Sequence, residues 1–316
     1  MLHVVAILVA ALLFGTTGTS QALGPEGTTP LSVGAVRMVI GGAALALIAF
    51  LLARRHARRR PALIPPALRA RPILLMALTG VCLTLYQPLF FLGTARNGVA
   101  VSTVIALGSA PVLAGLLEWA LTRRLPSRLW LTATALASGG VLLLGLGGGA
   151  HGAADPVGVL GAVGAGASFA VIANAQRRLL DEGWDVFTVV GAMGACAAAL
   201  SALALPFVDL AWLGAPRGLA MALWLGLATI AVAYVLFTWG LQGVSAATAA
   251  TLTLGEPLTA ALLGVTVLGE RLSPLGIAGL LVLGTGLVLL ALGSRGSRGS
   301  RESRAAHDPT PFAVEG

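Results

Sequence analysis

The residue of this sequence best placed to do chemistry is Glu256, an acidic residue inside an otherwise apolar stretch. It directly precedes Pro257, which lacks a backbone N–H and crowds the carbonyl of Thr253 four residues earlier. A charge deep in a membrane is costly unless it is paired or hydrated, so a carboxylate at that depth is a functional candidate by default. A protonatable carboxylate beside a broken helical turn suits proton coupling or contact with a cationic or zwitterionic group. The alternative is a protonated Glu256 that hydrogen-bonds within helix packing.

Polar residues are expected to share one helical face with Glu256. Intervals of three or four residues align Ser245, Thr248, Leu252, Glu256 and Thr259. All of these except Leu252 are polar, which predicts a stripe along the wall of a cavity. Hydroxyl groups on membrane helices also serve as packing contacts or bond back to their own backbone, and that alternative stays open.

Other segments supply further candidates for the cavity wall. These are Thr16, Thr79, Tyr86, Gln87, Tyr234 and Thr238. Tyr86 and Gln87 stand beside Pro88, another expected helix break, and Tyr234 and Thr238 are four residues apart. Amphipathic tyrosine rings suit pockets that are mostly apolar with a few polar groups.

Several other polar residues are expected to be structural. Arg37 opens a helix and is predicted to extend its guanidinium outward to the interface, the alternative being an anion gate. Glu118 lies near a helix end beside Arg123 and is predicted to form an interfacial ion pair. Asn174 and Gln176 are expected near a cytoplasmic helix end, within reach of solvent or headgroups. Trp130, Trp184, Trp212 and Trp239 are predicted to anchor at the two membrane interfaces.

The composition defines the class of protein that must position these residues. Of 316 residues, 57% are hydrophobic and 10% are charged, and the mean hydropathy is +0.92. Average soluble domains carry roughly 25% charged residues. The composition therefore excludes a cytoplasmic enzyme, a nucleic-acid-binding module and a disordered chain, and indicates a polytopic membrane protein.

Cofactors and metals are not expected. The four histidines are scattered over termini and loops without ligand spacing. All 20 basic residues are arginine, so the lysine of a phosphate-binding loop is absent.

Apolar stretches long enough to cross the membrane define the expected helices, since about 20 residues span the hydrocarbon core. We predict ten, at residues 2–22, 31–53, 72–94, 99–121, 129–149, 157–176, 186–206, 218–239, 244–268 and 274–293. The eighth and ninth are divided at a turn over Gly240–Gly243. The first is expected to stay as a helix. The alternative is a cleaved signal peptide ending near Ala22, but the segment lacks a basic beginning.

The arginines predict the orientation. With ten spans and the N-terminus inside, 16 of the 20 arginines fall in cytoplasmic segments. The positive-inside rule then places both termini in the cytoplasm of a cell-membrane protein. Residues 294–316, rich in Gly, Ser and Arg, are predicted to form a disordered cytoplasmic tail.

The two halves of the chain resemble each other weakly. At an offset of 146 residues, Pro111 and Ser127 match Pro257 and Ser273, and the order of helix types is shared. We therefore predict two five-helix repeats, residues 1–150 and 151–293. An odd number of spans inverts the second copy, and inverted repeats around a midplane site are a transporter architecture.

The stretch Leu254–Leu263, followed by Leu268–Pro274, resembles the signature near the end of EamA-type carriers of the drug/metabolite transporter superfamily. Ser109–Ala114 resembles the corresponding part of the first repeat, although Thr122-Arg123 stands where that family usually carries Gly-Glu. The resemblance implies ten transmembrane helices in two inverted repeats, a central cavity, and transport of small metabolites.

Together these features predict a secondary transporter rather than an enzyme, working by alternating access. The expected cargo is a small amphipathic metabolite such as an amino acid, and export is the expected direction. The expected partners are that substrate and the lipid bilayer, with no nucleic acid, and the protein would work as a monomer or homodimer. The alternatives are a membrane-embedded lipid-modifying enzyme, which usually needs clustered acids or histidines, and a non-transporting scaffold.

Overall fold

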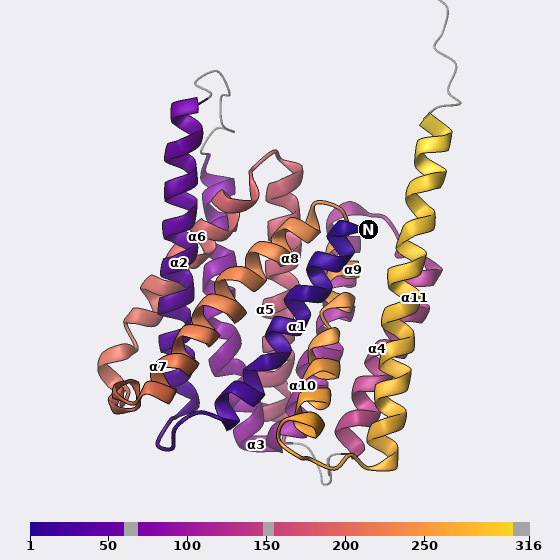
Figure 1. Ribbon diagram of the computed structural model, residues 1–316. Coiled ribbons are helices and arrows are strands. Elements are labelled where there is room, and N and C mark those ends of the chain that lie inside the picture. Colours follow the sequence, from indigo (N-terminus) through magenta and orange to yellow (C-terminus); the bar gives the residue numbers. More distant parts are fainter. Residues whose placement is uncertain (60–68, 148–154, 306–316) are drawn as a thin grey trace, which may run out of the picture.

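The computed structural model describes residues 1–59, 69–147 and 155–305, and every regular element in these ranges is a helix (Figure 1). In chain order these are α1 (Leu2–Ala22), α2 (Pro30–Arg59), α3 (Ala70–Thr122), α4 (Arg128–Gly147), α5 (Pro156–Asp181), α6 (Val186–Ala202), η1 (Leu205–Phe207), η2 (Ala211–Gly214), α7 (Pro216–Leu223), η3 (Trp224–Val232), α8 (Ala233–Leu241), α9 (Ala246–Leu252), α10 (Gly255–Thr266) and α11 (Pro274–Ala305). They pack as one bundle, with the N-terminus and the end of α11 at the same end. The predicted all-helical class is confirmed for the described residues.

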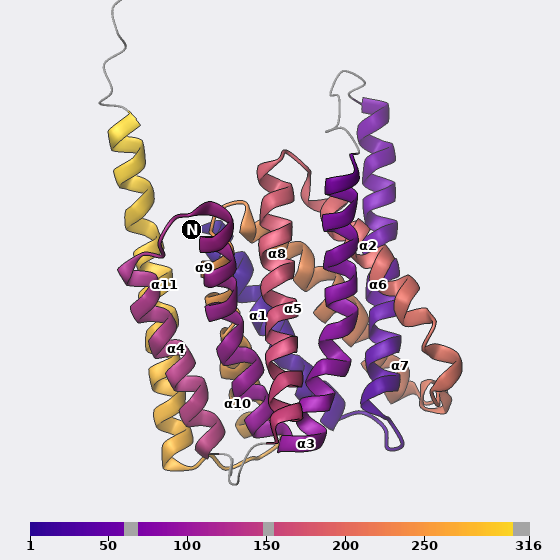
Figure 2. The same ribbon diagram turned by 180° about the vertical axis from the view of Figure 1, so that it is seen from behind.

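Nine stretches within the described ranges are helical, long and apolar enough to cross a membrane, against the ten predicted. The difference lies in α3, whose 53 residues cover two predicted segments. A straight helix of that length would measure about 80 Å, far more than the membrane is thick. Gly98 interrupts it with φ 76° and ψ 164°, values open to glycine because it has no Cβ. Figure 2 shows the first arm (residues 70–97) and the second arm (residues 99–122) meeting at the end opposite the N-terminus.

The apolar run that follows residue 216 divides where the sequence predicts. α7, η3 and α8 form one stretch that ends at Leu241, and α9 begins at Ala246. Ser245 caps α9, since its side chain accepts a hydrogen bond from the backbone N–H of Thr248. Within this stretch η3 is a π-helix, a rare geometry that recurs at functional sites.

The C-terminal helix differs from its prediction. α11 continues to Ala305, so residues 294–305 are helical where a disordered tail is predicted. Extending an existing helix costs far less than starting one, because each added residue gains a hydrogen bond. Residues 306–316 of the predicted tail lie outside the described ranges.

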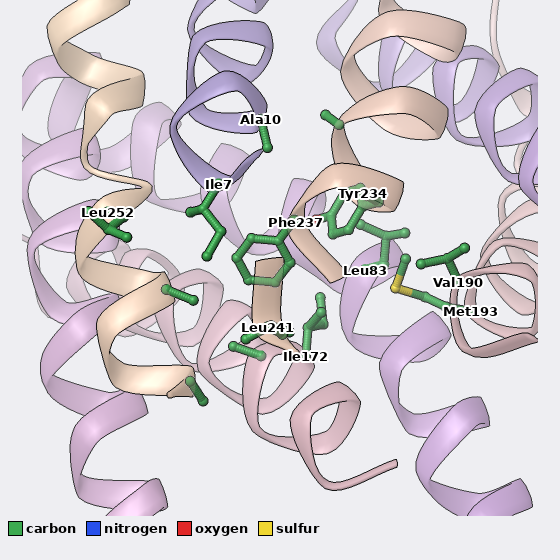
Figure 3. Packing of buried hydrophobic residues seen from close by; sticks show 14 of the residues in the cluster. Ile7, Ala10, Leu83, Ile172, Val190, Met193, Tyr234, Phe237, Leu241 and Leu252 are labelled. Carbon is green, nitrogen blue, oxygen red and sulfur yellow. The ribbon is translucent and has the colours of Figure 1, made fainter. Parts of the chain in front are cut away.

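The main core forms where the helices of both halves meet. Phe237 of α8 is fully buried and lies among Ile7 of α1, Leu83 of α3, Ile172 of α5 and other apolar side chains of this cluster (Figure 3). The ring of Phe237 also contacts that of Phe169, at 5.4 Å between centroids. The first apolar segment of the chain is therefore part of the core.

Small residues let particular helices approach closely, as expected in membranes. A Cβ atom on Gly15 of α1 would lie 2.5 Å from Cβ of Thr259 and 2.7 Å from the carbonyl oxygen of Glu256. A Cβ on Gly140 of α4 would lie 2.7 Å from the carbonyl oxygen of Gly279 in α11. α1 is thus in direct backbone contact with the start of α10.

Three of the four tryptophans predicted to anchor in the bilayer face protein instead. Trp130, Trp184 and Trp212 are buried. Trp130 packs on Gly115, where a Cβ would nearly touch the indole, and Trp184 joins a small apolar cluster with Leu179. Trp239 is half-buried and contacts the His3 ring at 4.6 Å. The prediction is wrong for the first three because neighbouring helices cover the rings.

Candidate functional site

The helix break at the predicted position is present. α9 ends at Leu252, two turn residues follow, and α10 begins at Gly255. Pro257 therefore falls in the first turn of α10, where its missing N–H costs no hydrogen bond. The carbonyl of Thr253 accepts from the backbone N–H of Glu256 at 2.9 Å, so it is not left without a partner.

Glu256 lies in the first turn of α10, where the helix dipole favours a negative charge. Its residue is half-buried, and within the described chain its carboxylate accepts no hydrogen bond and forms no ion pair. The break also interrupts the predicted stripe, since Ser245 and Thr248 belong to α9 and Glu256 and Thr259 to α10.

Arg37 is buried, contrary to the prediction that it extends to the interface. It lies two turns into α2, which starts at Pro30, and only 9% of it is exposed. Four residues later on the same face, a Cβ on Gly41 would lie 2.5 Å from the carbonyl oxygen of Gly226 in η3. Because η3 packs so closely on this face, Arg37 is enclosed. Its buried Nε has no hydrogen-bond acceptor.

Two tyrosines and a glutamine surround this arginine. Tyr234 of α8 is 6% exposed and meets the Phe14 ring edge-on at 5.3 Å. Tyr86 of the first arm of α3 stacks on Phe90 at 6.2 Å. Oε1 of Gln87 is buried without a donor, and it would lie 3.5 Å from a Cβ placed on Gly34, one turn before Arg37.

The titratable residues among these side chains are close neighbours. Arg37 lies within electrostatic range of Tyr234, Glu256 and Tyr86, and Glu256 within range of both tyrosines. Gln87 follows Tyr86 in the chain. We call Arg37, Tyr86, Gln87, Tyr234 and Glu256 the central polar cluster. They come from α2, α3, α8 and α10, two helices from each half of the chain. Figure 3 shows Tyr234 beside Phe237 and Leu83, so the cluster borders the main core.

The central polar cluster contains one basic and one acidic side chain that are not paired with each other. Arg37 is basic, Glu256 is acidic and they lie within electrostatic range of each other, yet the described residues include no ion pair between them. Buried polar atoms normally have a partner from protein or water. A ligand with a carboxylate toward Arg37 and an ammonium toward Glu256 would satisfy both, with the tyrosine rings as its apolar walls.

Most of the other predicted cavity residues use their hydroxyls inside the protein. Thr79 donates to the carbonyl of Met76, Thr16 to that of Leu13 and Thr259 to that of Gly255, each within its own helix. The Thr16 oxygen also accepts from Nε1 of Trp224 at 2.9 Å. Ser245 and Thr248 bond each other at the start of α9, away from the central polar cluster.

Thr238 bonds Gln176, which the sequence placed near a cytoplasmic helix end and not in the cavity wall. Its hydroxyl donates to Oε1 of Gln176 at 2.9 Å, and Nε2 of Gln176 donates to the sulfur of Met193. Asn174 donates to the carbonyls of Ala114 and Ala170. Both amides are buried, so the expectation that solvent or headgroups satisfy them is wrong. Their hydrogen-bond partners are as many as 62 residues away along the chain, so no pattern in the neighbouring sequence could have predicted these bonds.

Glu118 and Arg177 hold the turn between α8 and α9. Oε2 of Glu118 accepts from the backbone N–H of Ala247 at 2.8 Å, which caps the start of α9. Arg177 donates to the carbonyls of Leu241 and Val244. The predicted ion pair between Glu118 and Arg123 is absent from the described residues, because the carboxylate is engaged with the helix end instead.

No group of three or more His, Cys, Asp or Glu side chains in the described ranges could hold a metal ion.

Comparison with known proteins places this chain among transporters. The model of the EamA-like transporter family matches residues 1–146 and 156–292. A protein of Bacillus subtilis (strain 168) named "Uncharacterized transporter YwfM" is 41% identical over 289 residues, which cover 92% of this chain and 93% of that protein. A solved crystal structure is similar in fold, with a TM-score of 0.75 at 20% identity, covering 93% of this chain and 97% of that one.

Proposed function

The chain belongs to the EamA-like transporter family and is a membrane transporter, and from this premise we propose that it is a secondary active carrier of small amphipathic metabolites. The proposed cargo is zwitterionic, such as an amino acid, and the proposed direction is export. The single observation that carries the substrate class is the central polar cluster, in which Arg37 and Glu256 are opposed but unpaired.

The proposed mechanism is alternating access between two inverted repeats of five helices. Counting the two arms of α3 separately, on either side of Gly98, raises nine spans to ten. The family matches two consecutive segments of similar length, which supports a repeat. An odd number of spans per repeat makes the second copy inverted, and such carriers bind substrate between their halves.

The break between α9 and α10 supplies a moving part for this cycle. A helix interrupted at Thr253 and Leu254 can change angle there by exchanging the few backbone hydrogen bonds at the break, such as that from Glu256 to Thr253, while those within α9 and α10 are kept. Glu256 follows the break directly, and α1 packs on the same turn through Gly15. Proton uptake or release at Glu256 would therefore change both the charge of the site and the packing of α1 on α10, which supports its proposed role in proton coupling.

The proposed location is the cell membrane, with both termini in the cytoplasm. Arg71, Arg123, Arg128 and Arg177 lie at or next to helix ends on the same side of the bundle as the N-terminus (Figure 1). The positive-inside rule assigns an arginine-rich side to the cytoplasm. We call this side the arginine-rich end.

The function is tested with purified protein in liposomes that enclose a pH-sensitive dye. Pools of amino acids, amines and nucleosides are added, and substrate-dependent proton movement is compared between wild type, Glu256→Gln and Glu26→Gln. Glu26 is an exposed acid between α1 and α2, so its variant is a matched control for loss of one carboxylate.

We expect an amino acid pool to drive proton movement in wild type and Glu26→Gln but not in Glu256→Gln. Labelled-substrate counterflow then separates coupling from transport. Counterflow that persists in Glu256→Gln without proton movement assigns coupling to Glu256. Proton movement equal in all three proteins would overturn the proposed role of Glu256. Absence of flux for every pool in folded wild-type protein would overturn the proposed cargo.

A further inference from the structure

A pocket of about 620 Å³ lies between the second arm of α3 and α4, apart from the central polar cluster. Its wall is almost entirely apolar. The main lining residues are Val112, Leu116, Trp119, Trp130, Leu131 and Ser138. Leu116 and Leu131 are more than half exposed, so the pocket opens on the outer surface of the bundle rather than toward its core. These two helices lie side by side on the face that Figure 2 presents.

The depth of the pocket corresponds to one leaflet of a bilayer. It begins at Leu125 and Pro126, in the loop that joins the two helices, and reaches Ser138 of α4. From Arg128, the first residue of α4, to Ser138 the helix rises about 15 Å. Half of the hydrocarbon core is also about 15 Å thick. A single acyl chain entering from the loop would thus be covered along its length.

The mouth of the pocket carries positive charge that the protein leaves unpaired. Arg123, Arg124 and Arg128 are all exposed and lie in the loop or at the start of α4, and the described residues give them no carboxylate partner. In contrast, Arg71 and Arg177 at the same end pair with Glu182 and Asp181. Glu118 is the nearest acid along the chain, but its carboxylate is engaged by the start of α9.

The indole of Trp130 lies in the wall of the pocket. Trp130 is in the first turn of α4, and most of its surface is covered by protein. Because it lies only two residues beyond Arg128, it is at the depth where the glycerol esters of a phospholipid meet the hydrocarbon core. A lipid in the pocket would therefore bring its ester region and upper acyl chain next to this ring.

We propose that this pocket binds an anionic phospholipid, with one acyl chain between α3 and α4, the glycerol esters at the level of Trp130, and the headgroup at Arg123, Arg124 and Arg128. The apolar wall, the indole and the charges follow the order in which such a lipid presents chain, ester and phosphate. Clustered arginines next to a membrane helix attract anionic lipid. This inference does not depend on the proposed transport cycle.

The test measures quenching of Trp130 fluorescence by brominated lipids in vesicles. Full-length protein is reconstituted with increasing fractions of phosphatidylglycerol or phosphatidylcholine brominated on the acyl chains. The signal of Trp130 is the difference between the wild type and Trp130→Phe. We expect half-maximal quenching at an about tenfold lower fraction of phosphatidylglycerol than of phosphatidylcholine.

Two variants assign this preference to the pocket and its charges. Neutralising Arg123, Arg124 and Arg128 together to Gln should abolish the preference. The same change at Arg54, Arg69 and Arg71, exposed arginines at the same end, should leave it intact. Ala135→Phe fills the pocket without changing charge, and it should prevent quenching of Trp130 by either lipid.

Two outcomes would overturn the proposal. Equal quenching by the two lipids in wild type would mean that ordinary bilayer lipid occupies the groove. Weak quenching by both, together with protein cross-linking through this face, would mean that a second copy of the chain covers it. If Trp130→Phe does not fold, the preference is measured from the part of the wild-type quenching that disappears in Ala135→Phe.

Discussion

The centre of the bundle and its arginine-rich end both bring charged and amide side chains together, but they differ in how many of these polar groups have a hydrogen-bond partner. At the centre, Nε of Arg37 and Oε1 of Gln87 are buried without partners. At the end, Arg177 pairs with Asp181 at 2.7 Å and donates to two carbonyls, while Glu118 caps α9. The polar groups at the end are therefore paired within the protein, whereas those at the centre are in part unpaired, as our proposal of a substrate site there requires.

This difference has an energetic meaning. A buried polar group without a partner costs on the order of 1–3 kcal/mol, and more when it is charged. Proteins retain such groups mainly where function needs them, at the expense of stability. Changes at the centre should therefore remove transport while sparing or raising stability, and changes at the arginine-rich end should do the reverse.

The largest effect is expected from the double variant Arg37→Met/Glu256→Gln. It removes both charges of the central polar cluster, so no charge is left buried alone. Replacing buried charges by well-packed neutral groups is often neutral or stabilising by about 1–4 kcal/mol. Counterflow of the transported amino acid should fall about 100-fold or more, because charged contacts to the substrate are lost. Thermal unfolding in detergent and counterflow in liposomes measure the two effects. A thermal midpoint clearly below that of the wild type would contradict the comparison, because it would show that these two charges stabilise the fold.

Arg177→Ala and Glu118→Ala should show the opposite pattern. Each leaves backbone groups near the turn between α8 and α9 without a partner, which costs about 1–3 kcal/mol. The thermal midpoint should fall, while counterflow per folded molecule stays close to that of wild type. If transport is lost at unchanged stability, the end is part of the transport machinery and the contrast is wrong.

Two glutamines sharpen the comparison within a single residue type. Gln176 is satisfied by Thr238 and Met193, whereas Oε1 of Gln87 has no donor. Gln176→Leu removes the hydrogen-bond acceptor of the Thr238 hydroxyl and should lower the free energy of unfolding by about 1–2 kcal/mol. Gln87→Leu should leave stability unchanged or higher and lower transport. Equal stability losses in the two variants, measured by thermal unfolding, would show that burial alone decides the outcome.

The smallest effect is expected at an exposed ion pair. Arg71 pairs with Glu182 at 3.5 Å and its side chain is 59% exposed. Exposed pairs contribute at most about 1 kcal/mol. Arg71→Gln should shift the thermal midpoint by no more than the error of the measurement, in contrast to Arg177→Ala. A shift of the thermal midpoint as large as that of Arg177→Ala would mean that solvent screening does not weaken the Arg71–Glu182 pair relative to the contacts of Arg177.

Local patterns in the sequence predicted the helices and the break before Pro257 well. Apolar runs of about 20 residues give the spans, and the missing N–H of proline places the break. They did not predict that Arg37 is buried. That depends on the close contact of Gly41 with η3, made by a segment almost 200 residues away. Long-range packing of this kind leaves no periodic signal in either segment.

The candidate site was predicted in part for the same reason. Glu256 stands next to a helix break, and the structure brings it near Tyr86 and Tyr234. The break expected at Pro88, beside Tyr86 and Gln87, is absent, because the first arm of α3 continues through that proline. Thr79 and Ser245 carry hydroxyls at equally suitable spacings, but they bond within their own segments. Spacing along a helix cannot tell a hydroxyl that lines a cavity from one that bonds its own backbone.

The most direct test of the central claim is substrate selectivity in labelled counterflow. The best transported amino acid is competed by its decarboxylated amine and by its deaminated acid, in wild type, Arg37→Gln and Glu256→Gln. In wild type neither analogue should compete as well as the zwitterion. The amine should become an equal competitor in Arg37→Gln, and the acid in Glu256→Gln, because each variant stops recognising one charge. An unchanged order of competitors in both variants would contradict the assignment of the two charges to the substrate.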